Sequence, residues 1–391
     1  MKISEYRAPI IAGLVATVTG TLASTGIVLT GLSAVGANAT EATSAICVML
    51  IAYGVLTVAL SWRFRMPISI VWSTPGAALL ASASVLGLKF ETAVGAFFVC
   101  GLLLALTAFW PQLGRLVSSI PPAIASAMLA GVILSFCTAP FAAIATHPSI
   151  ALPVIASWLI MYRVKPLWAA PIAITVSAIL VEVFLPIDFS QTSLLPSLTL
   201  ITPHFELSAI VSLGIPLYIV TMASQNVPGI AIMRNFGFEI PFKAVMSSTG
   251  IATVVGSFFG GQALNLAAIT AAINADEHAD KDPQKRWVAA VTAGIAYLFV
   301  ALATSVTVAF ILQTPRELLL AGAGLALVGT ITNALQTASS DPHHRIAAVI
   351  TFLISASGIS EFGIGAAFWA LVGGLVSSYV VNFGKNSRVG L

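Results

Sequence analysis

The stretch Pro67–Leu80 reads PISIVWSTPGAALL in very apolar surroundings, and it decides the fold that the rest of the chain must accommodate. Pro67 and the β-branched residues after it favour about five residues of extended backbone. Ser73 or Thr74 can then cap the first free N–H groups of a helix, and Pro75 suits a first helical turn. The apolar run that follows is too short to span a membrane alone. The stretch therefore predicts an extended segment and a half-helix that meet at membrane depth.

A second interrupted stretch, Gly260–Asn274, reads GGQALNLAAITAAIN and lies about 190 positions further along the chain. Its glycine pair is expected to end the preceding helix, and Gln262–Leu264 to form a short extended piece. Asn265 is expected to cap a second half-helix that runs to the end of the stretch. Two interrupted segments at corresponding positions of two halves predict an internal repeat with a substrate site at the breaks, as in secondary transporters.

The composition is that of a polytopic membrane protein. The chain has 391 residues, of which 58% are hydrophobic and 8% charged, with a mean hydropathy of +1.00. Soluble domains carry about 25% charged residues, so we expect no soluble domain. No basic stretch is long enough to indicate nucleic-acid binding. The three cysteines lack metal-ligand spacing, and neither a metal nor another cofactor is expected.

Apolar runs predict an all-α protein with fourteen membrane segments, seven in each half, of which segments 3 and 10 are the two interrupted stretches. The first half comprises residues 1–185, a polar linker follows at 186–205, and the second half comprises residues 206–391. An odd number of segments per half makes the repeats inverted. The other predicted segments are Ala8–Leu32, Thr40–Trp62, Lys89–Trp110, Ser118–Phe141, Pro148–Tyr162, Pro166–Phe184, Glu206–Met233, Pro241–Phe259, Trp287–Leu312, Pro315–Leu335, Ile346–Ser357 and Glu361–Val381.

The basic residues support this segment count. With a cytoplasmic N-terminus and alternating segments, only Lys89 and Arg316 of the 17 basic residues fall outside the cell. Basic loops remain on the cytoplasmic side, and a missed or additional segment would destroy the asymmetry. We therefore expect a multi-pass protein of the cell inner membrane with both termini in the cytoplasm.

The inverted arrangement brings the two half-helices together. The first runs from mid-membrane outward and the second from mid-membrane inward, so their N-termini meet at the same depth. Each N-terminus carries roughly half a positive charge and free N–H donors, which favours an anion without any Lys or Arg in the membrane. The expected site residues are Ser73, Thr74 and Gly76 from the first break and Gln262 and Asn265 from the second, with Trp72 as a wall for a ring.

Polar side chains also occur inside the predicted segment Glu206–Met233. Ser224, Gln225 and Asn226 precede a Pro-Gly pair. Amide side chains at membrane depth are costly unless they are paired. We expect these three residues to complete the substrate site. Hydrogen bonding between helices is the alternative.

No acidic residue lies at the middle of a predicted segment, although proton-coupled carriers usually place one there. Glu182 lies at a predicted helix C-terminus, where the helix dipole disfavours a negative charge. Glu277 lies in the predicted cytoplasmic loop 276–286, the densest charge cluster in the chain. Either of these acids, or the substrate itself in protonated form, is expected to carry a coupled proton.

Three runs of sequence resemble one transporter family. They are IPPAIASAMLAGV at Ile120–Val132, IVTMASQNVPGIAIMRN at Ile219–Asn235, and the AxExHxDPxxRW-like run at Ala275–Trp287. Over the whole chain the sequence resembles the benzoate/proton symporter family of the BenE type. That family is more distantly similar to uracil and xanthine carriers and to sulfate-type anion carriers with a seven-plus-seven inverted fold.

The resemblance implies symport of protons and an aromatic carboxylate such as benzoate, by alternating access, and no enzymatic activity. It implies a core domain of residues 8–110 and 206–312 and a gate domain of residues 118–184 and 315–381. The uracil carriers place carboxylates on segments 8 and 10, where this chain has uncharged residues, and that departure suits an anionic ligand. The expected partners are the substrate, protons and the lipid bilayer, and a homodimer remains open.

Other functions stay compatible with the sequence. A carrier for nucleobases or other small organic anions could use the same fold, and an anion channel would differ by lacking uphill accumulation. An intramembrane enzyme would need a catalytic pair or metal spacing, neither of which is evident in the sequence. The sequence also has no nucleotide-binding P-loop.

Overall fold

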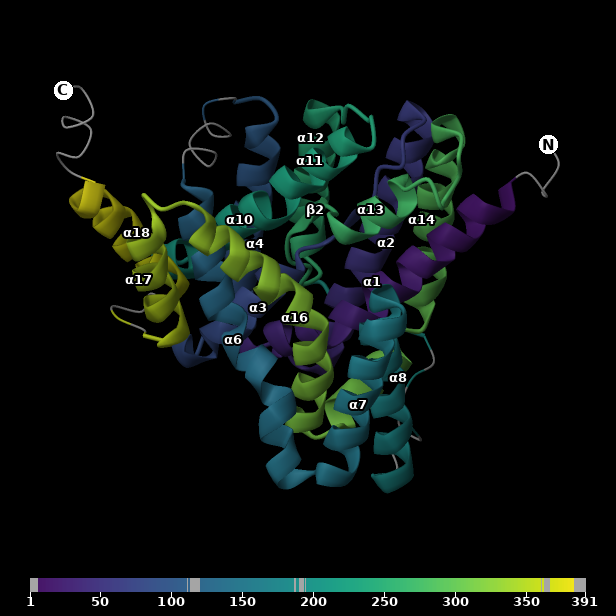
Figure 1. Cartoon of the computed structure of the whole chain (residues 1–391), viewed down its shortest axis with the longest axis horizontal. Helices are drawn as coiled ribbons and strands as arrows, with labels where there is room; N and C mark the ends of the chain where they lie inside the picture. The colour runs from purple at the N-terminus through teal and green to yellow at the C-terminus, as the bar shows by residue number, and fades with distance from the viewer. Residues whose placement is uncertain are drawn as a thin grey trace.

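The computed structural model of the chain describes residues 6–110, 112, 120–185, 188–189, 193, 195–359, 361 and 366–382. The described part is mostly helical, with one small two-stranded sheet near its centre (Figure 1). Within it, five helical stretches are long and apolar enough to cross a membrane, and several shorter apolar helices accompany them. The five are Ala39–Phe64, Phe90–Thr107, Pro122–Thr146, Leu207–Asn235 and Pro283–Leu302.

In the first half, the elements follow the apolar runs of the sequence within a few residues. The predicted start of segment 5 at Ser118 and the basic residues Lys2, Arg115, Lys385 and Arg388 lie outside the described residues. The elements are α1 (Arg7–Ala34), α2 (Ala39–Phe64), β1 (Ile70–Trp72), α3 (Thr74–Ser82), η2 (Ala83–Leu86), α4 (Phe90–Thr107), α6 (Pro122–Thr146), α7 (Pro148–Val164) and α8 (Pro166–Phe184).

In the second half, one predicted segment is divided into two helices. The segment predicted at Trp287–Leu312 is interrupted at Ala303, whose ψ angle of 4° is not helical. The elements are α9 (Leu207–Ala209), η3 (Ile210–Gly214), α10 (Ile215–Thr221), η4 (Met222–Asn226), α11 (Val227–Asn235), α12 (Phe242–Ser257), β2 (Leu264–Leu266), α13 (Ile269–Ala275), η5 (Pro283–Lys285), α14 (Trp287–Leu302), α15 (Thr304–Gln313), α16 (Arg316–Ser340), α17 (Arg345–Ala356) and α18 (Ala366–Asn382).

The continuous helical run Leu207–Asn235 widens twice into π-helical turns, η3 and η4. Pro216 and Pro228 each lie two residues after one of these turns. Proline has no N–H to donate, and its ring displaces the carbonyl four residues earlier. In both cases that carbonyl belongs to the π turn, so the wider turn accommodates the proline without ending the helix.

Strands β1 and β2 pair antiparallel at the centre of the molecule, with Val71 opposite Asn265. Side chains of two flanking helices satisfy strand N–H groups that the partner strand does not reach. The Thr57 hydroxyl of α2 accepts from the Ile70 N–H at 2.9 Å, and the Thr253 hydroxyl of α12 accepts from the Leu264 N–H at 3.0 Å. Non-helical backbone this deeply buried needs such partners.

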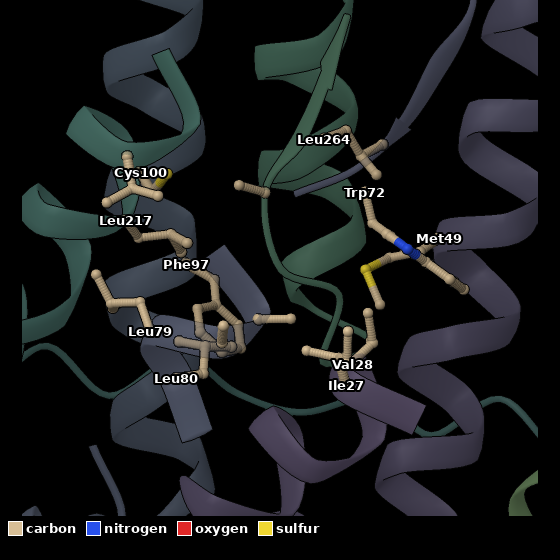
Figure 2. Close-up of a cluster of buried hydrophobic side chains, with 14 of the residues drawn as sticks. Ile27, Val28, Met49, Trp72, Leu79, Leu80, Phe97, Cys100, Leu217 and Leu264 are labelled. Carbon is tan, nitrogen blue, oxygen red and sulfur yellow. The ribbon is translucent and has the colours of Figure 1, made fainter. Parts of the chain in front are cut away.

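The described helices pack in two groups. One group, α1 to α4 and α10 to α14, surrounds the paired strands, whereas α6, α7, α8, α16, α17 and α18 pack mainly on one another (Figure 1). The apolar core of the first group is continuous from α1 and α2 across the strands to α4 and α10. Figure 2 shows Trp72 and Leu264 at the strand pair, with Met49 of α2 and Leu217 of α10 in the same buried cluster.

Candidate functional site

A cavity lies where the ends of the paired strands meet helices of both groups. It contains about 760 Å³ of space without atoms, part of it open to solvent. Among the described residues, no Asp, Glu, Lys or Arg lines the cavity. The lining residues are Gly20, Ser24, Tyr53, Val71, Trp72, Thr74, Pro75, Gln225, Ala267, Ala268, Thr270, Tyr297, Ala326, Leu327 and Thr330.

Three of the residues predicted from the sequence meet at this cavity. Trp72 lies at the end of β1, and its indole Nε1 donates to the Ser24 Oγ of α1 at 2.8 Å. Thr74 is the first residue of α3, and Gln225 lies in the π-helical turn η4. The cavity thus has a fixed aromatic wall, a helix start and an amide side chain.

The start of α3 is capped as the sequence predicts, but the cap uses a side chain and an N–H group that were expected to bind a ligand. The Ser73 Oγ accepts from the Gly76 N–H at 3.1 Å and from the Thr221 hydroxyl at 2.9 Å, and Ser73 is fully buried. Pro75 has no N–H. Of the first three residues of α3, only Thr74 has an N–H that the Ser73 cap does not take.

Gly76 does not line the cavity. A Cβ at this position would lie 2.5 Å from the Leu217 Cδ1 and 2.8 Å from the Ser73 Oγ. Gly76 was expected from the sequence to be a site residue, whereas in the structure its missing side chain leaves room for α10 and for the helix cap.

At the second break the prediction that Asn265 caps a helix is wrong. Asn265 lies in β2, which extends to Leu266 because it pairs with β1, and its Nδ2 donates to the Leu266 carbonyl at 2.9 Å. α13 begins only at Ile269, and Ala268 gives it no side-chain cap. The predicted extended piece Gln262–Leu264 is therefore displaced toward the C-terminus.

Gln262 is also buried outside the cavity lining. Its Nε2 donates to the Ser73 carbonyl at 3.1 Å, which ties the second break to the start of α3. The side-chain oxygens of Gln262 and Asn265 have no hydrogen-bond partner among the described residues. Both residues support the strand pair and do not contact the cavity.

The polar residues of the widened helix lie in different surroundings. Asn226 is fully buried, its Oδ1 accepts from the Leu266 N–H at 2.9 Å, and its Nδ2 contacts the Met222 Sδ at 3.3 Å. This is the hydrogen bonding between segments that was the alternative. Ser224 is half-buried and outside the lining, so Gln225 is the member of this group that faces the cavity.

Sequence reasoning missed an aromatic row and two hydroxyl groups. The ring of Tyr53 meets the ring of Trp72 edge-on at 5.4 Å and that of Tyr297 at 4.7 Å between centroids. The hydroxyl groups of Tyr297 and Thr270 lie close enough to interact with each other, but neither has a partner at normal hydrogen-bond geometry among the described residues. Single tyrosines and threonines in apolar helices carry no spacing signal, so the sequence gave no reason to select them.

The two acids proposed for proton coupling lie away from the cavity lining. Glu182 in the last turn of α8 and Glu277 in the loop after α13 are both exposed. In that loop, hydrogen bonds from the His278 N–H and imidazole lower the pKa of the Asp276 carboxyl, against an opposing effect of burial. The hydrogen bond to Asp276 in turn raises the pKa of His278.

Arg286 organises the same loop. It is 7% exposed and donates to the Ala275 carbonyl and to the Asp280 carbonyl, each at 2.7 Å. Ala275 ends α13, so the guanidinium lies at the negative end of that helix, where a cation is stabilising. The charge cluster is therefore partly a structural clamp on α13.

Comparison with known proteins identifies the family. Residues 5–380 match the family described as benzoate membrane transport protein, BenE. This chain belongs to the BenE family. The BenE family is a family of membrane transport proteins and not of enzymes.

Two relatives of this BenE chain align over most of its length. It is 36% identical over 374 residues to the inner membrane protein YdcO of Escherichia coli, with 95% of each chain covered. It is 29% identical over 327 residues to the benzoate membrane transport protein of Acinetobacter baylyi, with 82% of each chain covered.

Solved transporter structures share the fold of this BenE chain. The transmembrane domain of a cyanobacterial bicarbonate transporter, BicA, is 15% identical with a TM-score of 0.59, over 98% of this chain and 99% of that one. The murine anion transporter Slc26a9 in its inward-facing state is 14% identical with a TM-score of 0.61, over 98% of this chain and 70% of that one. The chain is thus a mostly helical polytopic membrane protein with a transporter fold.

Proposed function

We propose that this protein is a secondary active transporter that takes up an aromatic carboxylate, benzoate or a close relative, together with protons across the inner membrane. The observation that carries the proposal is the uncharged cavity beside the paired strands, with Trp72 and Tyr53 along one wall and the starts of α3 and α13 at its edge. Aromatic walls suit a ring, and helix starts and hydroxyl groups suit a carboxylate.

We further propose that the chain is the inverted repeat of seven plus seven segments expected from the sequence. The equivalent pairs Thr57–Ile70 and Thr253–Leu264 support this, because in each half a threonine of the helix before the strand accepts from the first strand N–H. The antiparallel pairing of the two strands, each followed by a short helix, fits a two-fold axis through the Val71–Asn265 pair.

Transport would proceed by movement of a core against a gate. The helix group around the strands corresponds to the predicted core, residues 8–110 and 206–312, and the other group to the predicted gate, residues 118–184 and 315–381. The cavity supports this division because α16 of the second group closes one side of it with Ala326, Leu327 and Thr330. Separation of the two groups would open the cavity to one side of the membrane.

Uptake into proteoliposomes tests this function. Labelled benzoate should accumulate above its external concentration when the outside is more acidic than the lumen, and only equilibrate when the two pH values are equal. Benzoate must be compared with bicarbonate and uracil, because solved neighbours of this fold include a bicarbonate transporter. If the protein transported bicarbonate or uracil in preference to benzoate, the proposal of an aromatic substrate would be wrong. Flux without uphill accumulation would favour an anion channel.

The same assay tests the proton site. We propose that Glu182, Glu277 or the protonated substrate itself carries the proton, since no Asp or Glu lies among the described residues that line the cavity. Glu182→Gln or Glu277→Gln should abolish proton-driven accumulation and keep benzoate exchange if that acid is the carrier. Accumulation that survives both changes would leave the protonated substrate as the carrier.

Replacing Gln225 and Asn226 separately should give different defects. Gln225→Ala should weaken benzoate binding by about tenfold or more, because hydrogen bonds to a charged group contribute roughly 1.5–3 kcal/mol. Asn226→Ala should instead lower the melting temperature, because it leaves the buried Leu266 N–H without an acceptor. Binding isotherms and thermal melts of both purified variants separate the two roles. Normal binding by Gln225→Ala would remove Gln225 from the site.

Single cysteines on a cysteine-free background test the orientation of the halves. Arg163 and Asp282 should label only from the cytoplasm, and Asp188 only from outside, all three being exposed positions. Labelling is measured with a membrane-impermeant thiol reagent on right-side-out and inverted vesicles. Labelling of a cysteine at position 282 from outside would overturn the inverted repeat, because segment 10 would then cross the membrane in the opposite direction.

A further inference from the structure

The start of α3 and the region around α13 offer a carboxylate different partners. At α3, the Ser73 cap takes the Gly76 N–H and Pro75 has none, so of the first three residues only Thr74 has an N–H outside the cap. Beside α13, the cavity lining includes Thr270 and Tyr297, which are 5% and 1% exposed. Their hydroxyl groups lie close to each other and have no partner at normal hydrogen-bond geometry among the described residues. A buried hydroxyl without a partner costs free energy unless a ligand supplies an acceptor.

We infer that Thr270 and Tyr297 are specificity residues that donate hydrogen bonds to the two oxygens of the substrate carboxylate. This inference rests on the proposed function and places the charged end of the substrate beside α13 and α14. A carboxylate only accepts hydrogen bonds, and it can accept one from each hydroxyl at the same time. Charge-assisted bonds of this kind are stronger than bonds between neutral groups.

Two positions on α1 indicate how the ring of the substrate would lie. A Cβ on Gly20 would lie 3.1 Å from the Thr270 Cγ2 and 3.2 Å from the Tyr297 hydroxyl, so the two hydroxyl-bearing side chains flank Gly20. Ser24 lies one turn further along α1 and holds the Trp72 indole. The four residues from Gly20 to Ser24 rise about 6 Å along the helix, so a ring whose carboxylate lies at Gly20 would extend toward Trp72.

Hydroxyl-deletion variants test this inference by competition binding to the purified protein. Tyr297→Phe and Thr270→Val should each weaken benzoate binding by about tenfold or more, and should weaken binding of the neutral amide benzamide much less. Thr270→Ser keeps the hydroxyl and should restore benzoate affinity. The benzoate-to-benzamide ratio is the decisive readout, because a loss of packing alone would weaken both ligands alike.

Matched controls remove hydroxyl groups of the same type away from the cavity. Tyr218→Phe removes a hydroxyl that pairs with Thr107 at 2.7 Å, and Thr249→Val removes one that donates to the Val245 carbonyl at 2.8 Å. Both controls should keep benzoate affinity.

The outcomes distinguish this inference from the proposed function. If the wild-type protein binds benzoate and both hydroxyl deletions leave its affinity and the ratio unchanged, the inference is wrong and the function stands. If the wild-type protein binds no aromatic carboxylate, both are wrong. If Tyr297→Phe does not fold, the pair Thr270→Val and Thr270→Ser still decides, since equal benzoate affinity of the two would overturn the assignment.

Discussion

Gly31→Val should leave little or no folded protein. Gly31 lies where α1 crosses α3, and a Cβ there would be 2.4 Å from the Ala77 carbonyl oxygen and 3.2 Å from the Leu80 Cβ. The first obstacle is backbone and cannot rotate away, so we expect a loss of about 3 kcal/mol or more, at the upper end of overpacking effects. That is a large part of a typical folding free energy of about 5–15 kcal/mol. The yield of monodisperse protein and its melting temperature measure the effect.

Gly26→Val is the matched control on the same helix. Within the part of the chain that the structure describes, nothing lies within 4 Å of a Cβ at Gly26, and both substitutions carry the same cost of a β-branched residue in a helix. The control should therefore keep near-normal yield and stability. Equal yields of the two variants would mean that α1 and α3 are not in close contact. The cavity, which needs α1 and the start of α3 together, would then be in doubt.

The sequence contained the main local signals for the helix starts and the breaks. The backbone preferences of Pro67, Ser73 and Pro75 affect only their near neighbours in the chain. Strand β1 and the capped helix α3 lie at the positions that these preferences predict. The end of the second break could not be located in this way. β2 continues through Asn265 because it pairs with a strand about 190 positions earlier in the chain. The local propensity of Asn265 gives no information about a contact with so distant a segment.

The cavity lining was predictable only where the first break, or a residue type unusual for its surroundings, indicated it. An amide side chain at membrane depth is unusual, so the sequence predicts both Gln225 and Asn226 as site residues. It does not indicate which of the two faces the cavity. The structure separates them by a contact between distant segments, the Asn226 bond to Leu266. Tyr53, Thr270 and Tyr297 are ordinary residues of apolar helices, and only their convergence on one cavity makes them notable.

Benzoate should bind far more tightly than benzamide at neutral pH. A carboxylic acid with a pKa near 4 is ionised there, so benzoate carries a charge that the otherwise similar amide lacks. Favourable interaction of an anion with a helix start contributes up to about 2 kcal/mol in a partly buried site, which corresponds to roughly 30-fold in affinity. Charge-assisted hydrogen bonds add to this difference. Displacement of labelled benzoate from the purified protein measures both affinities.

Trp72→Leu provides the complementary test, because Trp72 is expected to contact the ring that both ligands share. Its loss should weaken benzoate and benzamide by similar factors and leave their ratio nearly constant, since the charged end of benzoate is untouched. Benzamide competing as well as benzoate in the wild-type protein would mean that ring contacts with Trp72 and Tyr53 supply the affinity. In that case the cavity would be an aromatic site without selectivity for charge, and its proposed role as an anion site would have to be abandoned.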